Sequence, residues 1–208
     1  MGLDCVIFDL ETTGLSPRAD EIIQIAAVRM RDGWIDEADW FFSYVNPGRP
    51  VPYWITQYTG VTNQDVSDAP GIAEVLAEFS RYSGDLPLLA HNGRRFDMKF
   101  LAASCLKHQL PTRPVQGYDS MALSKLLWGP RGVGHGLDAV LCRLRISEQG
   151  VRRHDARGDV RLLSKAVQTM WNLARAQQGE VSLPTFTGVL PAAAVSMTMA
   201  PAQNDMSG

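Results

Sequence analysis

The chain has 208 residues, of which 45% are hydrophobic and 20% are charged. This balance predicts a soluble globular protein with one domain of ordinary size and an extension. Its three cysteines are odd in number and lie in apolar runs, which excludes a disulfide framework and favours a reducing, cytoplasmic setting. No basic-then-apolar leader and no apolar run of membrane-spanning length is evident, so no membrane association is expected.

The net charge of −2 excludes a protein that coats nucleic acid indiscriminately. Residues 131–165 nevertheless carry eight basic groups against four acidic ones. A local basic face that contacts phosphates is one interpretation of this segment. A solvated helix surface is the other, and it is the simpler explanation for any single arginine.

Residues 4–11 predict a buried strand whose side chains alternate between two apolar faces. Asp9 and Glu11 fall on the face that Cys5 and Ile7 define as apolar, with Cα atoms about 6.6 Å apart. Two carboxylates at the end of a core strand repel each other unless a cation holds them. A divalent metal, or a pair of metals, is the natural candidate.

Two other interpretations of this strand end stay open at this point. The carboxylates are suitable residues for the bend that Thr12, Thr13 and Gly14 would form. An apolar strand that ends in acidic residues also resembles the nucleophile loop of haloacid-dehalogenase-like phosphatases. Glu11 stands where those enzymes need aspartate, so the rest of the chain has to decide.

The remaining elements follow from periodicity and turn residues. Further strands are predicted at 21–28, 34–45 and 86–90, with a hairpin turn at Asp32-Gly33, and helices at 53–58, 71–82, 94–107, 137–144 and 155–177. This order predicts an α/β or α+β sheet with helices packed on it. From residue 179 onward, prolines, alanines and a lack of lysine and arginine predict a flexible, disordered tail, 179–208, after a folded domain, 1–178.

Two more acidic positions bear on the strand-end carboxylates. Asp97 lies in the first turn of a predicted helix, where an acid by itself favours the helix dipole. Asp159 precedes apolar residues at i+3, i+4, i+7, i+8 and i+11, so its carboxylate projects from a core-facing stripe. An acid there is destabilising unless it is paired or bound to metal. His154 lies just before that helix and can reach the same centre.

Three ordered motifs now resemble a known family. They are Phe8-Asp9-Leu10-Glu11-Thr12-Thr13-Gly14, His91-Asn92-x3-Phe96-Asp97-x2-Phe100-Leu101 and His154-x4-Asp159. They are similar to the three exonuclease motifs of the DEDDh (DnaQ-like) 3′–5′ exonucleases, which include the proofreading epsilon subunit of bacterial replicative DNA polymerase and ribonuclease T. The resemblance covers about residues 3–175, and it disfavours the phosphatase interpretation.

The resemblance implies an α/β, RNase H-like mixed β-sheet flanked by helices. It implies that Asp9, Glu11, Asp97 and Asp159 bind two Mg²⁺ or Mn²⁺ ions, with Asp9 shared between them. It also implies that His154 is the general base, a role that suits an imidazole near neutral pH. The substrate-binding residues it implies are Thr12, Thr13, Gly14, Leu15, Asn92 and Phe96.

The expected reaction is hydrolysis from a single-stranded or frayed 3′ end of DNA to nucleoside 5′-monophosphates, in proofreading or repair. RNA 3′-end trimming is the alternative substrate, since substrate choice depends on contacts to the 2′ position. Residues 180–186, Glu-Val-Ser-Leu-Pro-Thr-Phe, resemble the peptide by which bacterial replication proteins bind the sliding clamp, with Glu180 in place of glutamine. A clamp- or polymerase-binding accessory protein whose nuclease activity is secondary is therefore a further alternative.

Overall fold

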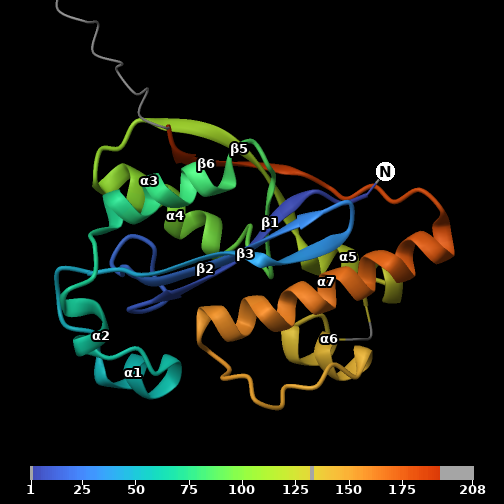
Figure 1. The fold of residues 1–208 in the computed structure, drawn as a ribbon, viewed down its shortest axis with the longest axis horizontal. Coiled ribbons are helices and arrows are strands. Elements are labelled where there is room, and N and C mark those ends of the chain that lie inside the picture. The colour runs from blue at the N-terminus through green and yellow to red at the C-terminus, as the bar shows by residue number, and fades with distance from the viewer. Residues whose placement is uncertain (1, 132–133, 193–208) are drawn as a thin grey trace, which may run out of the picture.

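The computed structural model describes residues 2–131 and 134–192. They form one six-stranded sheet in the order β3-β2-β1-β4-β5-β6, with helices on both of its faces (Figure 1). The strands are β1 (Cys5–Thr12), β2 (Ile22–Arg31), β3 (Trp34–Tyr44), β4 (Leu88–Ala90), β5 (Thr112–Asp119) and β6 (Phe186–Pro191). β4 pairs in parallel with β1 and β5, and the other pairs are antiparallel. The predicted α/β fold with a mixed, helix-flanked sheet is therefore confirmed.

Seven helices surround the sheet in the described part of the chain. They are α1 (Tyr53–Thr59), α2 (Asn63–Ser67), α3 (Ile72–Ser83), α4 (Asp97–Lys107), α5 (Ser120–Trp128), α6 (Leu137–Leu144) and α7 (Ala156–Gln178). In Figure 1, α3 and α4 lie on one side of the sheet and α5, α6 and α7 on the other. No helix of the described residues combines the length and the apolar character needed to cross a membrane.

Strand β1 lies in the interior of the sheet and has an apolar cluster on each face. Cys5 and Ile7 belong to the cluster that α7 covers, whereas the even-numbered side chains of β1 pack with residues of α3 and α4. This confirms the alternation expected from the sequence. It also places Asp9 and Glu11 on the face covered by α7, because side chains at i and i+2 of a strand point the same way.

Helix α7 begins at a capped end that fixes its position on the sheet. The Asp155 side chain accepts a hydrogen bond from the Gly158 backbone N–H at 3.1 Å, and it also accepts one from Gln24 of β2 at 3.1 Å. Beyond the cap, Val160, Leu163 and the following apolar positions are buried against the sheet. The first turn of α7 is therefore tied directly to the strand beside β1.

Strand β5 and helices α2 and α5 have no counterpart among the predicted elements. β5 contains Pro114 and Gly117, two residue types that are depleted in strands, so its sequence lacks a strand signature. Gly117 is needed where it stands, because a Cβ there would lie 2.4 Å from the Phe186 ring of β6. The strand is thus defined by its neighbours rather than by its own residues.

The predicted flexible tail, 179–208, is wrong for residues 186–191. These residues form β6, which pairs with β5 over its whole length, and Leu190 is fully buried. The Ser80 hydroxyl of α3 donates a hydrogen bond to the Pro191 carbonyl oxygen at 2.6 Å. Low charge suggested disorder, but apolar contacts across the sheet edge outweigh that composition. The folded sheet thus extends past the expected boundary at residue 178, and residues 193–208 lie outside the described part of the chain.

This correction predicts a large difference between two substitutions in the same short strand. Leu190→Ala should lower the free energy of unfolding by about 2–4 kcal/mol, because it removes a buried side chain from the core. Thr187→Ala, on an exposed position of β6, should change it by less than about 0.5 kcal/mol. Urea unfolding followed by circular dichroism measures both. Equal, negligible effects would show that the segment does not pack on the sheet.

Candidate active site

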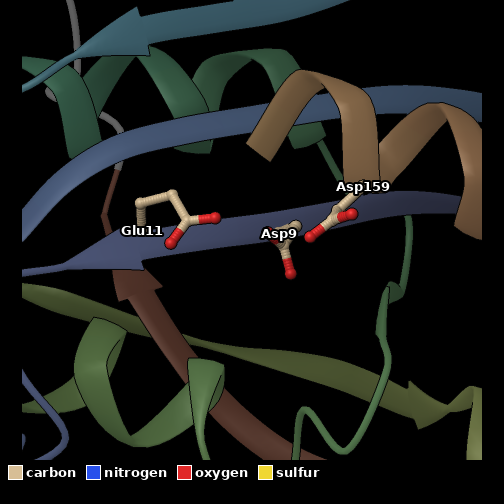
Figure 2. Close-up of side chains that lie close together, drawn as sticks. All are labelled: Asp9, Glu11 and Asp159. Atoms are coloured by element: carbon tan, nitrogen blue, oxygen red, sulfur yellow. The ribbon is translucent and has the colours of Figure 1, made fainter. Parts of the chain in front are cut away.

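Three carboxylates from two elements meet above the sheet. Asp9 and Glu11 project from β1, and Asp159 projects from the first turn of α7 toward them (Figure 2). Each offers one oxygen, and these oxygens all lie within 4.8 Å of one another. Glu11 and Asp159 are buried, and Asp9 is half-buried. The period-two spacing of β1 and the apolar stripe of α7 together produce this cluster.

Asp97, the first residue of α4, adds a fourth carboxylate close to Asp9. Its side chain is 3% exposed, and its Oδ1 atom has no hydrogen-bond partner among the described residues. The turn before α4 is sharp, since Asn92 has a φ of 60° and its backbone N–H donates to Asp119 Oδ1 at 3.0 Å. Asp97 thus lies close enough for its charge to act on Asp9 and Glu11.

The pKa values of Asp9, Glu11 and Asp97 are all raised, with burial as the largest cause of each shift. Burial is the largest cause of the raised pKa of Asp9, followed by the charges of Asp97, Glu11 and Asp159. Burial and the charge of Asp159 raise the pKa of Glu11 to about 8. Burial raises the pKa of Asp97 to about 7, although backbone amides of Asp97 and Leu10 oppose the shift. The cluster holds more negative charge than its surroundings stabilise.

Arg153 neutralises part of this charge and was missed in the sequence. Its Nε atom donates to Asp159 Oδ1 at 2.7 Å, and its Nη1 atom donates to Asp138 at 2.6 Å and to Glu148 at 3.0 Å. The guanidinium therefore ties Asp159 to α6 and to the loop before α7. A guanidinium shared among three carboxylates gives no periodic signal, so the sequence pattern could not indicate it.

His154 lies at the edge of the same cluster. Its backbone has a φ of 57°, a rare conformation for a residue other than glycine, and its N–H donates to Asp159 Oδ2 at 3.1 Å. Its ring stacks on Tyr58 of α1, with centroids 3.9 Å apart. The side chain is 37% exposed, and Nδ1 lies 3.9 Å from Asp159 Oδ2. The imidazole is therefore fixed between α1 and α7 and open to solvent.

A cleft of about 350 Å³ joins the carboxylates to a rim of larger side chains. Five of the six predicted substrate-binding residues line it, namely Thr12, Gly14, Leu15, Asn92 and Phe96. Thr13 does not line this cleft. Its hydroxyl accepts hydrogen bonds from Arg49 at 2.6 Å and from the Glu21 backbone N–H at 2.9 Å, so it stabilises the loop from beneath. A Cβ on Gly14 would lie 2.4 Å from the Asp20 carboxylate, so a larger residue there would displace the Asp20 side chain.

Two aromatic residues of the cleft rim were not predicted. Trp54 and Tyr58 lie one turn apart on α1, line the cleft, and are 56% and 57% exposed. The helix was expected at 53–58, but its aromatic residues were assigned no role. Their number could have indicated a role, since a seven-residue helix with three aromatic residues cannot bury them all. Exposed aromatic faces beside a polar centre are suited to stacking on a planar ligand.

The residues present fit divalent metal ions. Four carboxylates supply the hard oxygen ligands that Mg²⁺ and Mn²⁺ prefer, and the unpaired Oδ1 of buried Asp97 is a ligand atom in need of a cation. Arg153 engages only Asp159 within this set. A bound cation would supply the positive charge that Asp9, Glu11 and Asp97 lack.

Comparison with known proteins gives consistent matches. A family model described as "Exonuclease" matches residues 6–167. The chain is 39% identical over 190 residues to a DNA polymerase III subunit epsilon-like protein of Rhodobacter capsulatus, a match that covers 90% of this chain and 26% of that protein. It is 40% identical over 151 residues to a PolC-type DNA polymerase III of Latilactobacillus sakei, covering 73% of this chain and 10% of that protein. The chain therefore spans about a quarter or less of these relatives.

Solved structures show the same architecture. The nuclease domain of 3′hExo, a DEDDh family member bound to rAMP, superimposes with a TM-score of 0.72 at 19% identity, covering 87% of this chain and 96% of that one. Exonuclease X in complex with 5′ overhanging duplex DNA superimposes with a TM-score of 0.64 at 25% identity, covering 85% and 94%. The first likeness, at its low identity, establishes a shared fold.

The raised pKa values predict that the metal-free protein loses stability as the pH rises. In the unfolded chain, Glu11 and Asp97 release their protons near pH 4, whereas in the folded protein they keep them up to about pH 8 and about pH 7. The folded state thus binds more protons between these values, and the free energy of unfolding falls with pH. In EDTA, the melting temperature should drop by several degrees between about pH 5.5 and about pH 8.5.

Added Mg²⁺ or Mn²⁺ should reverse this drop, most strongly at the higher pH, because a cation stabilises the ionised carboxylates. Glu11→Gln should reduce both the drop and the metal effect. Asp85→Asn, on an exposed loop, serves as the matched control and should leave both as in the wild type. Differential scanning fluorimetry supplies the readout. A melting temperature that rises with pH in EDTA would contradict the electrostatic assignment.

Proposed function

The chain belongs to the exonuclease family, and from that premise we propose that it is a 3′–5′ exonuclease that releases nucleoside 5′-monophosphates from the 3′ end of DNA. The observation that carries the proposal is the meeting of Asp9, Glu11 and Asp159 within 4.8 Å, with Asp97 and His154 in the same cleft. These five residues are the acidic and basic groups that phosphodiester hydrolysis needs.

Members of this family depend on divalent metal ions, and the proposal includes two Mg²⁺ or Mn²⁺ ions. Asp9, Glu11, Asp97 and Asp159 would hold them. When bound, such ions make water more acidic and stabilise the charge that develops on the leaving 3′-oxygen. The raised pKa values of Asp9, Glu11 and Asp97 support this assignment, because each carboxylate is more stable beside a cation.

His154 would remove a proton from the attacking water. Its stack on Tyr58 and the hydrogen bond from its backbone N–H to Asp159 limit the positions that the ring can take. The exposed side of the imidazole leaves a path by which the proton passes to solvent. A general base of this kind contributes about 10²–10⁴-fold to the rate.

The terminal nucleotide would occupy the cleft of about 350 Å³, a volume within the range of small-ligand sites. Its base would stack among Leu15, Trp54, Tyr58 and Phe96, all of which line the cleft. Asn92 would contact the sugar or the base. Stacking of this kind tolerates every base, as a nuclease that removes nucleotides one after another requires.

We propose DNA rather than RNA as the substrate, with a single-stranded or frayed 3′ end. The similar proteins are named as DNA polymerase III parts, and one structural neighbour was solved with duplex DNA. RNA trimming is the second candidate, because the 3′hExo domain was solved with rAMP. Contacts to the 2′-hydroxyl decide between the two. The three free cysteines support a cytoplasmic setting.

A replicative polymerase is the proposed partner, supported by the names of the relatives. Docking on a sliding clamp through residues 180–186 stays a prediction. Val181 and Leu183 pack against the apolar cluster beside α7, and Phe186 begins β6, so clamp binding would have to detach them. A clamp titration that shifts no NMR resonance of this segment would remove the clamp from the proposal.

The central test compares 3′-labelled single-stranded DNA, a mispaired duplex and RNA in Mg²⁺. The wild-type protein should release labelled nucleoside 5′-monophosphate from both DNA substrates faster than from RNA. Asp9→Ala should abolish release, because a ligand central to the carboxylate cluster is lost, and Asp85→Ala, on an exposed loop, should match the wild type. Turnover by Asp9→Ala at the wild-type rate would sink the metal assignment, and preference for RNA would change the substrate.

His154→Ala should lose at least about 10²-fold in single-turnover rate while it keeps its affinity for Mn²⁺. The reason is that the imidazole acts on the water and is not among the metal ligands. Rapid quench and isothermal calorimetry measure the two quantities separately. His108→Ala, at an exposed position, is the matched control and should change neither. Loss of Mn²⁺ binding in His154→Ala would replace the general-base role with a ligand role.

A further inference from the structure

A second groove lies beside the proposed active site, between strand β3 and the start of α7. It has a volume of about 530 Å³. Its lining includes Trp40 and Phe42 of β3, Arg152 of the loop before α7, and Arg157 and Arg161 of α7. The three arginines belong to the basic segment 131–165, for which the proposed reaction gives no role.

The charge of this groove is open to a ligand. Arg152, Arg157 and Arg161 are all exposed, and none of them forms an ion pair within the described part of the chain. Two acids also line the groove. Asp155 already accepts hydrogen bonds from Gln24 and Gly158, and Glu37 is exposed. The groove therefore carries three guanidiniums and two carboxylates, and one of these carboxylates is held by its own hydrogen bonds.

Aromatic faces alternate with these charges. The Arg157 guanidinium lies 3.7 Å above the centroid of the Phe42 ring, and Trp40 lies two residues earlier on the same face of β3. Grooves that bind single-stranded nucleic acid combine guanidiniums for the phosphates with aromatic rings for the bases. An acidic protein surface would meet the same charges, but it would leave the Trp40 ring without a planar partner.

The groove lies next to the catalytic cleft, although the two share no lining residue. Asp9 pairs with Ala26 of β2, and Ala26 pairs with Phe42 of β3, so the three side chains form one row on the face that α7 covers. Two strand spacings place Phe42 about 10 Å from Asp9. Arg152 is two residues from His154, and its side chain lies against Gly60 at the end of α1. A strand bound at the carboxylates reaches this groove within a typical single-strand site of about 4–16 nucleotides.

We propose that this groove, formed by Trp40, Phe42, Arg152, Arg157 and Arg161, binds the single-stranded part of the substrate on the 5′ side of the terminal nucleotide. The proposal rests on the proposed exonuclease function and deepens it, because it makes the enzyme prefer strands longer than a dinucleotide. The arginines contact phosphates and Trp40 stacks on a base, while the Phe42 ring holds the Arg157 guanidinium in place. The terminal nucleotide occupies only the catalytic cleft.

The test uses two substrates and two matched double variants of the full chain. A nitrophenyl ester of thymidine 5′-monophosphate occupies the cleft alone, whereas a single-stranded DNA of about 20 nucleotides also reaches the groove. Arg157→Gln/Arg161→Gln removes two positive charges from the groove. Lys165→Gln/Arg175→Gln removes two from other exposed positions of the same helix, so the change in net charge is equal.

The groove variant should lose roughly tenfold in kcat/KM on the long strand, while ester hydrolysis stays at the wild-type rate. The slope of log KM against log salt should decrease by about 1.4, because the variant loses two phosphate contacts and each contact on a single strand contributes about 0.7. The control variant should behave as the wild type on both substrates. An equal loss on ester and strand, or the same loss in the control variant, would overturn the proposal.

Binding measured without catalysis separates this proposal from the proposed function. Fluorescence anisotropy of the labelled strand in EDTA needs no metal and no turnover. A roughly tenfold weaker affinity of the groove variant supports strand binding in the groove, whether or not the strand is hydrolysed. Absence of hydrolysis counts only against the proposed nuclease activity. Equal affinities of the groove variant and the wild type overturn the groove even where the strand is hydrolysed. If the groove binds an acidic protein instead of the DNA strand, the two affinities for the strand should likewise be equal.

Discussion

Mutual repulsion among buried carboxylates is the constraint on which the rest of this structure depends. Asp9 and Glu11 are held on one face of β1 by the pleat of the strand, and α7 and α4 bring Asp159 and Asp97 toward them. Burial raises the free energy of each charge, and each neighbouring charge raises it further. The sheet and its two helical layers must supply enough stability to hold this cluster together. Such a cluster is destabilising for the fold and is suited to binding cations, which makes it a functional feature rather than a structural one.

The sequence was sufficient to identify those site residues that interrupt the regular apolar pattern of a single strand or helix. Asp9 and Glu11 stood out because they interrupt an apolar face with a period of two, and Asp159 because it sits on an apolar stripe of a helix. Both rules concern a single element, so the sequence alone was sufficient. The sequence did not predict the roles of Arg153, Trp54 and Tyr58, because these roles depend on contacts between different helices and strands. A guanidinium shared among three carboxylates and an aromatic rim on a seven-residue helix have no period to detect.

The two strands at one edge of the sheet, β5 and β6, also depend on contacts between elements that the sequence of one element does not reveal. β5 and β6 each contain a proline and a glycine, residue types that are depleted in strands, so the local preference for a strand is weakened in both. The two strands nevertheless pair over six consecutive positions, and the Phe186 ring fills the space that the missing side chain of Gly117 leaves. Here tertiary contact overrides local preference. Long elements that bury one face, such as α7, are the ones whose sequence is sufficient to predict them.

The start of α7 joins the two parts of the proposed substrate path. One turn of this helix presents Asp159 toward β1, while Arg157 and Arg161 lie on the side that faces β3. Because an α-helix is rigid over this length, any shift that moves the arginines along the bound strand also moves Asp159 relative to Asp9. The Asp155 cap and its bond to Gln24 fix the helix on β2 and resist such a shift. In the proposed path, strand binding in the groove and alignment at the carboxylates would therefore both depend on the first turns of α7.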